Sequence, residues 1–269
     1  MLDPGPYSTF ETLAAGIERL GWRVVDVENV LLTHIHFDHA GAAWKFAEHG
    51  ATIFLNPIGI PHLKNPEKLW NSAKQIYQDK MDSLWGEMKP IKEESLVGLA
   101  DGQSVEFGNA IFETFYTPGH AVHHNVYKLE EVFFTGDVAG VKIENGPVVP
   151  PCPPPDINIE LWKKTIERLR EIKAKGIYQT HYGYHDDVEN LFRQLEVELD
   201  KWANYIQPMY EDQKPTEDIT PVFVDTIQSF YRSKGLDEEQ IQAYELANPS
   251  WMSVGGLLRY WRLKEQGRL

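Results

Sequence analysis

The most constraining feature of this sequence is an apolar segment that runs directly into a cluster of histidines and an aspartate. Val30-Leu31-Leu32-Thr33 is the β-branched and leucine-rich run typical of a buried strand. Four potential metal ligands follow it within six residues, namely His34, His36, Asp38 and His39. Imidazoles and carboxylates are the ligands that zinc and similar metals prefer. The segment therefore predicts a metal site, against the alternative of a polar loop with exposed histidines.

Three later segments repeat this order of strand, turn and potential ligand. Strands are predicted over residues 111–116, 132–134 and 177–179, and the ligands that follow them are His120, Asp137 and His181. Loops at one edge of a sheet are where a rigid scaffold presents functional groups. Each segment alone is weak evidence, because a single histidine after a strand is more often a hydrogen-bonded structural residue. Together the four segments predict a site with seven ligands.

The remaining pattern predicts a strand-rich body followed by a helical tail. Further strands are expected over residues 22–27, 51–55 and 125–129, and between the turns Asp101-Gly102 and Gly108-Asn109. Helices are expected over residues 42–49, 66–85 and 161–175, and throughout the chain beyond residue 186, with the last one starting at Asn248-Pro249. Proline-rich residues 147–155 must form a stiff loop. We therefore expect a domain over residues 1–186, with a helical insertion at 56–90 over the site, and a helical extension over 187–269.

Charge and composition narrow the function classes. The chain has 40 acidic and 26 basic residues and a net charge of -14, so it lacks the basic footprint of a nucleic-acid-binding protein. Its one cysteine, Cys152, suits a reducing compartment. The sequence has no apolar run of about 18 residues, and no signal-peptide pattern at its start. We expect a soluble cytoplasmic protein that binds neither nucleic acid nor membrane.

The ordered motifs T-H-I-H-F-D-H-A-G, T-P-G-H, T-G-D and T-H-Y-G resemble those of the metallo-β-lactamase superfamily over residues 20–185. The resemblance implies an α+β fold, a four-layer αββα sandwich with its metal site at one edge. The helical tail is similar in character to the extensions of glyoxalase-II-like and uncharacterised hydrolase members. The resemblance also implies two metal ions: His34, His36 and His120 would hold the first, Asp38, His39 and His181 the second, and Asp137 would bridge them.

Two divalent ions, zinc first with iron or manganese as alternatives, imply a hydrolase. A hydroxide that bridges the metals would attack a small ester, lactone or thioester. The resemblance gives catalytic roles to Asp38, as acceptor of the water proton, and to Asp137. An alternative is a mononuclear iron persulfide dioxygenase, which would use only the first triad and an aspartate. A nuclease is disfavoured by the acidic charge, a secreted β-lactamase by the missing export signal, and a purely structural zinc site by the number of ligands.

Several residues outside the motifs have two readings. Arg259, Arg262 and Lys264 would suit a glutathione conjugate, or they are the solvated end of the last helix. Four strand-end threonines could orient the ligand imidazoles or could be ordinary strand ends: Thr33, Thr117, Thr135 and Thr180. His123 and His124 could support the site, whereas His49, His62 and His185 are expected in surface loops. Aromatic residues of the insertion and tail are expected mainly in helix cores.

The start of the chain departs from the superfamily pattern. Members usually begin with two strands before an Asp-Pro-Gly turn, whereas Leu2-Asp3-Pro4-Gly5 stands at the very start here. We therefore expect one of two explanations: the chain begins late, through a misassigned start or a trimmed form, or the first sheet lacks its usual edge. Because an uncovered edge invites pairing with another chain, we expect this form to be less stable than one extended upstream, or to be more oligomeric, for example as a homodimer.

Overall fold

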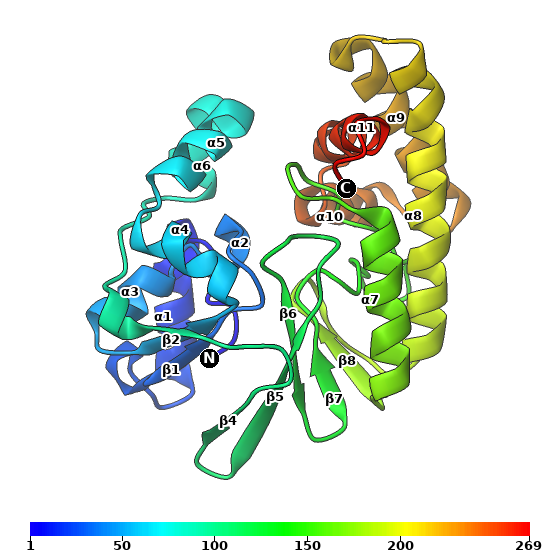
Figure 1. The fold of residues 1–269 in the computed structure, drawn as a ribbon. Helices are drawn as coiled ribbons and strands as arrows, with labels where there is room; N and C mark the ends of the chain where they lie inside the picture. Colours follow the sequence, from blue (N-terminus) through cyan, green and yellow to red (C-terminus); the bar gives the residue numbers. More distant parts are fainter. The chain divides into compact units, whose positions relative to one another are not determined.

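A computed structural model describes residues 1–269, and the chain divides into two compact units. The first unit comprises Met1–Tyr116 and His123–Glu130, and the second comprises Thr117–Val122 and Glu131–Leu269. Strands β1 to β6 belong to the first unit, and the long helices drawn from green to red in Figure 1 belong to the second. The division into residues 1–186 and 187–269 stays a prediction.

The first unit contains a three-stranded parallel sheet in the order β1-β2-β3. Its strands are β1 (Asn29–Leu31), β2 (Thr52–Leu55) and β3 (Leu96–Gly98). Val30, Ile53 and Leu96 share one register across the sheet and belong to an apolar core with helices α1 (Phe10–Arg19) and α3 (Ala43–Glu48). The edge beside β1 carries Met1 and Asp3, which form backbone hydrogen bonds of 2.9 and 3.0 Å with Leu31.

Antiparallel strands complete the sheet structure of the first unit. They are β4 (Ser104–Phe107), β5 (Ala110–Tyr116) and β6 (Asn125–Leu129), paired in that order. Gly102 and Gly108 adopt positive φ angles of 76° and 61° at the turns that the sequence predicts around β4. β6 is tied to the parallel sheet because Tyr127 donates a 2.7 Å hydrogen bond to the carbonyl oxygen of Leu32.

Residues 56–90 form short helices, as predicted. They are η3 (Pro57–Gly59), α4 (Ile60–Lys64), α5 (Glu67–Tyr77), η4 (Gln78–Lys80) and α6 (Met81–Leu84). The helix expected over 66–85 is broken at Gln78, whose φ of 50° ends α5. This segment packs on Phe37, whose ring lies 5.7 Å from that of Trp70 and 6.0 Å from that of Trp85.

The second unit combines a small sheet with helices. Strand β7 (Val132–Phe134) pairs in parallel with β8 (Gly176–Gln179), which pairs antiparallel with β9 (Gly183–His185). The helices are α7 (Ile159–Ile172), α8 (Val188–Glu211), α9 (Thr216–Ser233), α10 (Glu238–Ala247) and α11 (Ser250–Glu265). Their apolar faces bury residues such as Trp162, Leu195 and Phe223. The predicted helical tail is therefore confirmed.

One predicted strand is wrong. Residues 22–27 form not a strand but the 3₁₀ turn η2 (Val24–Asp26). The Arg23 guanidinium binds the Asp26 carboxylate at 2.6 Å, and the same carboxylate accepts from the Arg23 backbone N–H at 2.8 Å. These local bonds favour a tight turn, and Trp22 is 62% exposed, so the apolar side chains gain little from a sheet.

No helix of the chain combines the length and the apolar character needed to cross a membrane.

Candidate metal centre

Four candidate ligands lie together in the first unit. His34 follows β1 after Leu32 and Thr33, His36 stands at the N-terminal end of the short helix α2 (Phe37–Ala40), and α2 itself carries Asp38 and His39. His34 and His39 are buried, whereas the Asp38 side chain is 32% exposed. The apolar neighbours Leu32, Ile35 and Ala40 belong to the core, so the loop that presents these ligands is anchored from within.

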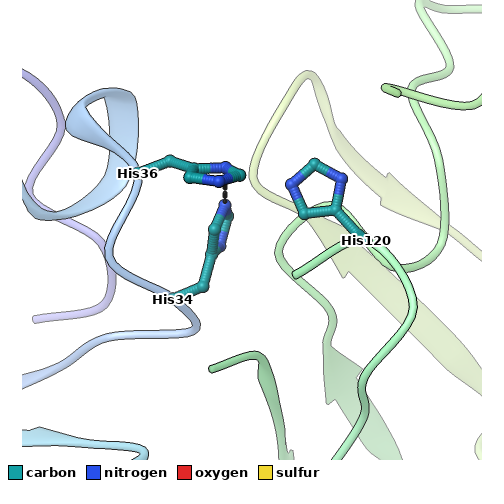
Figure 2. Close-up of side chains that lie close together, drawn as sticks. All are labelled: His34, His36 and His120. Carbon is teal, nitrogen blue, oxygen red and sulfur yellow. Dashed lines mark hydrogen bonds between the residues drawn. The ribbon is translucent and has the colours of Figure 1, made fainter. Parts of the chain in front are cut away.

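The rings of His34 and His36 face each other through their nitrogens. His34 Nε2 lies 2.9 Å from His36 Nδ1, and the ring planes meet at 79° (Figure 2). The Thr33 hydroxyl donates to Asp3 at 2.7 Å, so its oxygen accepts from His34 Nδ1 at 3.1 Å. The proton of His34 is thereby held on Nδ1, and the Nε2 lone pair points toward His36. Two nitrogens that share one proton in this way can instead share a metal cation.

Asp3 fixes the orientation of His39. Its carboxylate accepts hydrogen bonds from the Thr33 backbone N–H at 2.8 Å, from the Thr33 hydroxyl, and from His39 Nδ1 at 2.9 Å. The side chain of Asp3 is only 3% exposed. Because a carboxylate accepts the Nδ1 proton, His39 presents a lone pair at Nε2, as zinc-binding histidines do. Sequence reasoning missed this role, although the neighbouring Pro4-Gly5 marks a tight turn that buries a carboxylate.

His39 and Asp38 are spaced as two ligands of one ion. His39 Nε2 lies 3.5 Å from Asp38 Oδ2, beyond a good hydrogen bond. Two ligand atoms that each lie about 2.0–2.1 Å from a tetrahedral zinc ion are about 3.3–3.4 Å apart. The observed spacing is close to that value. The donor types, the fixed Nδ1 proton and this spacing all fit a metal ion at this position.

The other three candidate ligands lie together in the second unit. Asp137 follows β7, and its two carboxylate oxygens face different histidines: Oδ2 lies 3.5 Å from His120 Nε2, and Oδ1 lies 3.5 Å from His181 Nε2. Both separations again match two ligands of one ion. A carboxylate that turns one oxygen to each of two imidazoles has the geometry of a bridging ligand. This spacing fits the bridging role that the resemblance gives to Asp137.

His120 is held by its loop and by a carbonyl group. It is the third ring drawn in Figure 2, and it lies in the loop after β5. Its Nδ1 donates a 2.9 Å hydrogen bond to the carbonyl oxygen of Pro151, which leaves the Nε2 lone pair toward Asp137. The preceding Gly119 has a φ of 137°, and a Cβ there would overlap the backbone of Trp162. The glycine is therefore required for the loop to lie close against α7.

The strand β8 holds the segment that follows Asp137. The amide of Gln179 is buried and donates to the carbonyl oxygens of Ala139 and Gly140 at 2.9 and 2.8 Å. His181 follows two residues later at the turn into β9, where Tyr182 has a φ of 80°. The sequence did not predict β9, because a three-residue strand has too little pattern to be read. Its residue His185 therefore lies in a strand rather than in the predicted loop.

Some of the other candidate histidines and threonines lie beside His34, whereas Thr135 does not contact a ligand. His123 and His124 are buried beside His34, with ring centroids 6.1 and 4.9 Å away, and Ile35 N–H donates to His123 Nδ1 at 3.4 Å. Thr33 supports His34, whereas the Thr135 hydroxyl donates to the carbonyl oxygen of Tyr178 at 3.3 Å. Thr135 is therefore an ordinary strand-end residue.

The helical insertion reaches the ligand loop through Tyr77. Burial is the main cause that raises the pKa of Tyr77 far above its ordinary value, and the negative charge of Asp38 adds to it. The hydroxyl is therefore protonated at neutral pH. Since Phe37 also packs against Trp70 and Trp85, helices α5 and α6 contact the helix that carries Asp38 and His39.

Comparison with known proteins agrees with this reading of the residues. A family model described as the metallo-β-lactamase superfamily matches residues 1–181. A metallo-β-lactamase fold-containing protein of Sulfurisphaera tokodaii is 28% identical over 161 residues, which are 58% of this chain and 61% of that protein. An atrochrysone carboxyl ACP thioesterase of Aspergillus fumigatus is 25% identical over 65% of this chain. The match spans 44% of the thioesterase, so this chain covers less than two thirds of either relative.

A solved structure resembles the whole chain. A metallo-β-lactamase family protein of Thermus thermophilus matches with a TM-score of 0.71 and 19% identity, over 99% of this chain and 84% of that one. The likeness includes the C-terminal helices, and it confirms the α+β fold that the ligand motifs predict.

Proposed function

Because the chain belongs to the metallo-β-lactamase superfamily, we propose that it is a binuclear metal-dependent hydrolase of a small ester, lactone or thioester. The observation that carries the proposal is the spacing of the candidate ligands. Three pairs of donor atoms, one in the first unit and two in the second, are each 3.5 Å apart. Hydrogen bonds to Asp3 and Pro151 hold the Nδ1 protons of His39 and His120, so that Nε2 is available to a cation.

The proposed ligands form two groups. One ion would be held by His34, His36 and His120, and the other by Asp38, His39, Asp137 and His181. Asp137 would also contact the first ion through the oxygen that faces His120. Neutral imidazoles and carboxylates suit zinc, and iron and manganese accept the same donors.

The chain's own residues would position the substrate and move the proton. When bound, two divalent ions lower the pKa of water to about 7 and polarise an acyl carbonyl group. Asp38 is the most exposed of the carboxylate ligands, so it is the one placed to accept a proton from water or to meet a substrate. Asp137 is 5% exposed, which suits a group that holds position and does not exchange protons with solvent.

A relative supports an acyl thioester as the substrate, and contacts of basic residues in α11 argue against a glutathione conjugate. One relative is an acyl carrier protein thioesterase, and this likeness supports an acyl thioester over a phosphate ester. A glutathione conjugate would need free basic residues, yet Lys264 binds Glu160 and the Tyr260 hydroxyl, and Arg259 donates to the Pro155 carbonyl oxygen at 2.8 Å. These contacts favour a structural role for Lys264 and Arg259 over a role in binding glutathione.

The test is elemental analysis joined to a substrate panel. The protein is purified without added metal, and its content of zinc, iron and manganese is measured per chain. The same preparation is assayed on thioesters, lactones and aryl esters. We expect close to two ions per chain and hydrolysis of a thioester or ester that is lost after chelation and restored by zinc.

The alternative predicts different measurements. A persulfide dioxygenase would contain one iron per chain and would consume oxygen with a persulfide substrate. Oxygen uptake with a single iron, together with no hydrolysis across the panel, would overturn the proposal. A preparation that binds no metal under any loading condition would do the same.

A further inference from the structure

The proline-rich loop of the second unit contacts the candidate ligand His120 and pairs with the segment that follows Asp137. The Pro151 carbonyl oxygen accepts the 2.9 Å hydrogen bond from His120 Nδ1. Two residues earlier, Val149 exchanges backbone hydrogen bonds of 2.8 and 3.0 Å with Val141, in the segment that follows Asp137. The position of this loop, residues 147–155, therefore helps to set where the His120 ring points. We call it the proline loop.

The C-terminal helices bind the proline loop along most of its length. The Tyr244 hydroxyl donates to Pro147 at 2.7 Å, the Asn248 amide donates to Pro150 at 3.1 Å, and the Ser253 hydroxyl accepts from the Cys152 N–H at 3.3 Å. Each of these three side chains is at most 3% exposed. A proline cannot donate a backbone hydrogen bond, so a loop of this composition depends on outside donors to satisfy its carbonyl groups.

One glycine lets the last helix approach the loop. A Cβ on Gly256 in α11 would overlap the carbonyl oxygen of Cys152, the residue next to Pro151. The preceding Gly255 is different, since a Cβ there would lie 3.8 Å from the nearest atom, Pro154 Cγ, which is an ordinary contact. The close approach of α11 to the loop therefore depends on Gly256 and not on Gly255.

We propose that α10 and α11 position the ligand His120 by holding the proline loop in place. The helical tail is then part of the metal centre's support rather than an independent appendage. The chain of contacts runs from Asn248, Ser253 and Gly256 through the loop to the Pro151 carbonyl oxygen and the His120 ring. The inference rests on the proposed function only in taking His120 to be a ligand.

The two neighbouring glycines supply a matched experiment. Gly256→Ala pushes the loop away from α11, whereas Gly255→Ala makes the same chemical change in the same helix without an overlap. In metal-free protein, we expect Gly256→Ala to shift the His120 imidazole nitrogen resonances and to speed exchange of its Nδ1 proton, while Gly255→Ala leaves both as in the wild type. In loaded protein, Gly256→Ala should lower metal affinity by about 10–100-fold and lower kcat with little change in KM.

A second pair of variants covers the case in which Gly256→Ala does not fold. Asn248→Ala removes one donor to the loop, and Trp261→Phe removes a comparable 2.9 Å bond from the Trp261 indole to the Ala203 carbonyl oxygen, which lies outside the loop. If the C-terminal helices had only a structural role, the His120 resonances would be the same in the two variants. We expect the shift only in Asn248→Ala.

The outcomes separate this inference from the proposed function. Unchanged His120 resonances in both Gly256→Ala and Asn248→Ala would overturn the positioning role, whatever the enzyme does. The wild type could bind no metal while the His120 resonances still shift in these two variants. In that case the proposed function fails, and the positioning of His120 by the C-terminal helices stands.

Discussion

Asp137 offers the sharpest test at the scale of single residues, because its two oxygens face two histidines. We expect Asp137→Ala to reduce the bound metal per chain and to lower kcat/KM by at least about 100-fold, the scale on which loss of one stabilising group lowers catalysis. His36→Ala should act in the same direction. The far-UV circular dichroism should stay close to that of the wild type, since neither side chain belongs to an apolar core. The exposed Asp200, paired with Lys163, provides a control as Asp200→Ala. Full activity in Asp137→Ala would remove the proposed site.

The carboxylate of Asp3 should affect metal binding through His39, which it contacts directly, and through Thr33, which contacts His34. Asp3→Asn keeps the shape of the side chain but weakens the acceptor for His39 Nδ1. Partners of this kind typically change metal affinity by 10–100-fold, and we expect a loss in that range, measured by competition with a chelating indicator. Asp26→Asn, which disturbs only the turn at Arg23, should leave the affinity unchanged. Equal affinities in the two variants would show that the Asp3 contact is incidental.

The seven candidate ligands could be predicted from sequence because they lie in four short segments, each of which follows a strand whose apolar pattern is local. Their partners could not be. Asp3 lies 36 residues before His39, and Pro151 lies 31 residues after His120. No local pattern connects residues at that separation. Thr33 could be proposed, because it adjoins His34, while Thr135 shows that the same position at another strand bonds only to backbone.

At the scale of elements, the insertion should depend on Phe37. This ring is 6% exposed and packs between Trp70 and Trp85. Phe37→Ala should lower the free energy of unfolding by about 3 kcal/mol, as for other buried phenylalanines, and should speed hydrogen exchange in α5 and α6 first. The exposed Leu246 gives the comparison, since Leu246→Ala should change stability by less than about 0.5 kcal/mol. Uniform exchange across the chain in Phe37→Ala would contradict this dependence.

The ion pair between Glu160 in α7 and Lys264 in α11 should make a small contribution to stability that depends on pH. Partial burial acts to raise the pKa of Glu160, but its bonds to Lys264 and Tyr260 outweigh burial and lower it. A lowered carboxyl pKa stabilises the fold above its unfolded value of 4.5, and that stability is lost as the pH falls through the folded value. Both side chains are over 40% exposed, so Glu160→Gln should cost at most about 1 kcal/mol at pH 7. Urea unfolding should show the difference at pH 7 and a smaller one as the pH falls below 4.5.

The elements themselves were predictable where the pattern is long. Helices α7 and α8 repeat apolar residues over 14 and 24 positions, and both were expected. The errors fall on short elements: residues 22–27 have β-branched residues but form a turn closed by Arg23 and Asp26, and β9 has only three residues. In each case local hydrogen bonds or tertiary pairing decide the structure, and the periodicity of apolar residues in the sequence predicts neither.

At the scale of the whole molecule, the net charge of -14 contrasts with the charge expected at the proposed metal centre. Two divalent cations contribute four positive charges against the two carboxylates Asp38 and Asp137. The proposed centre is therefore locally cationic inside an acidic protein, which suits a carbonyl-bearing or anionic substrate. The same surplus of negative charge favours uptake of metal and disfavours nucleic acid as a substrate.

Removal of metal should therefore destabilise the entire chain. An ion that binds only the folded state would stabilise that state by mass action, by about 2.7 kcal/mol at a free concentration of 100 times Kd. We expect the chelated protein to melt several degrees lower than the zinc-loaded protein, and the Tm to rise with the concentration of zinc. Differential scanning calorimetry over a series of zinc concentrations measures both effects, and Asp137→Ala should show a much weaker dependence on zinc. A Tm that does not respond to chelation or to added zinc would mean that the folded chain does not bind the ion.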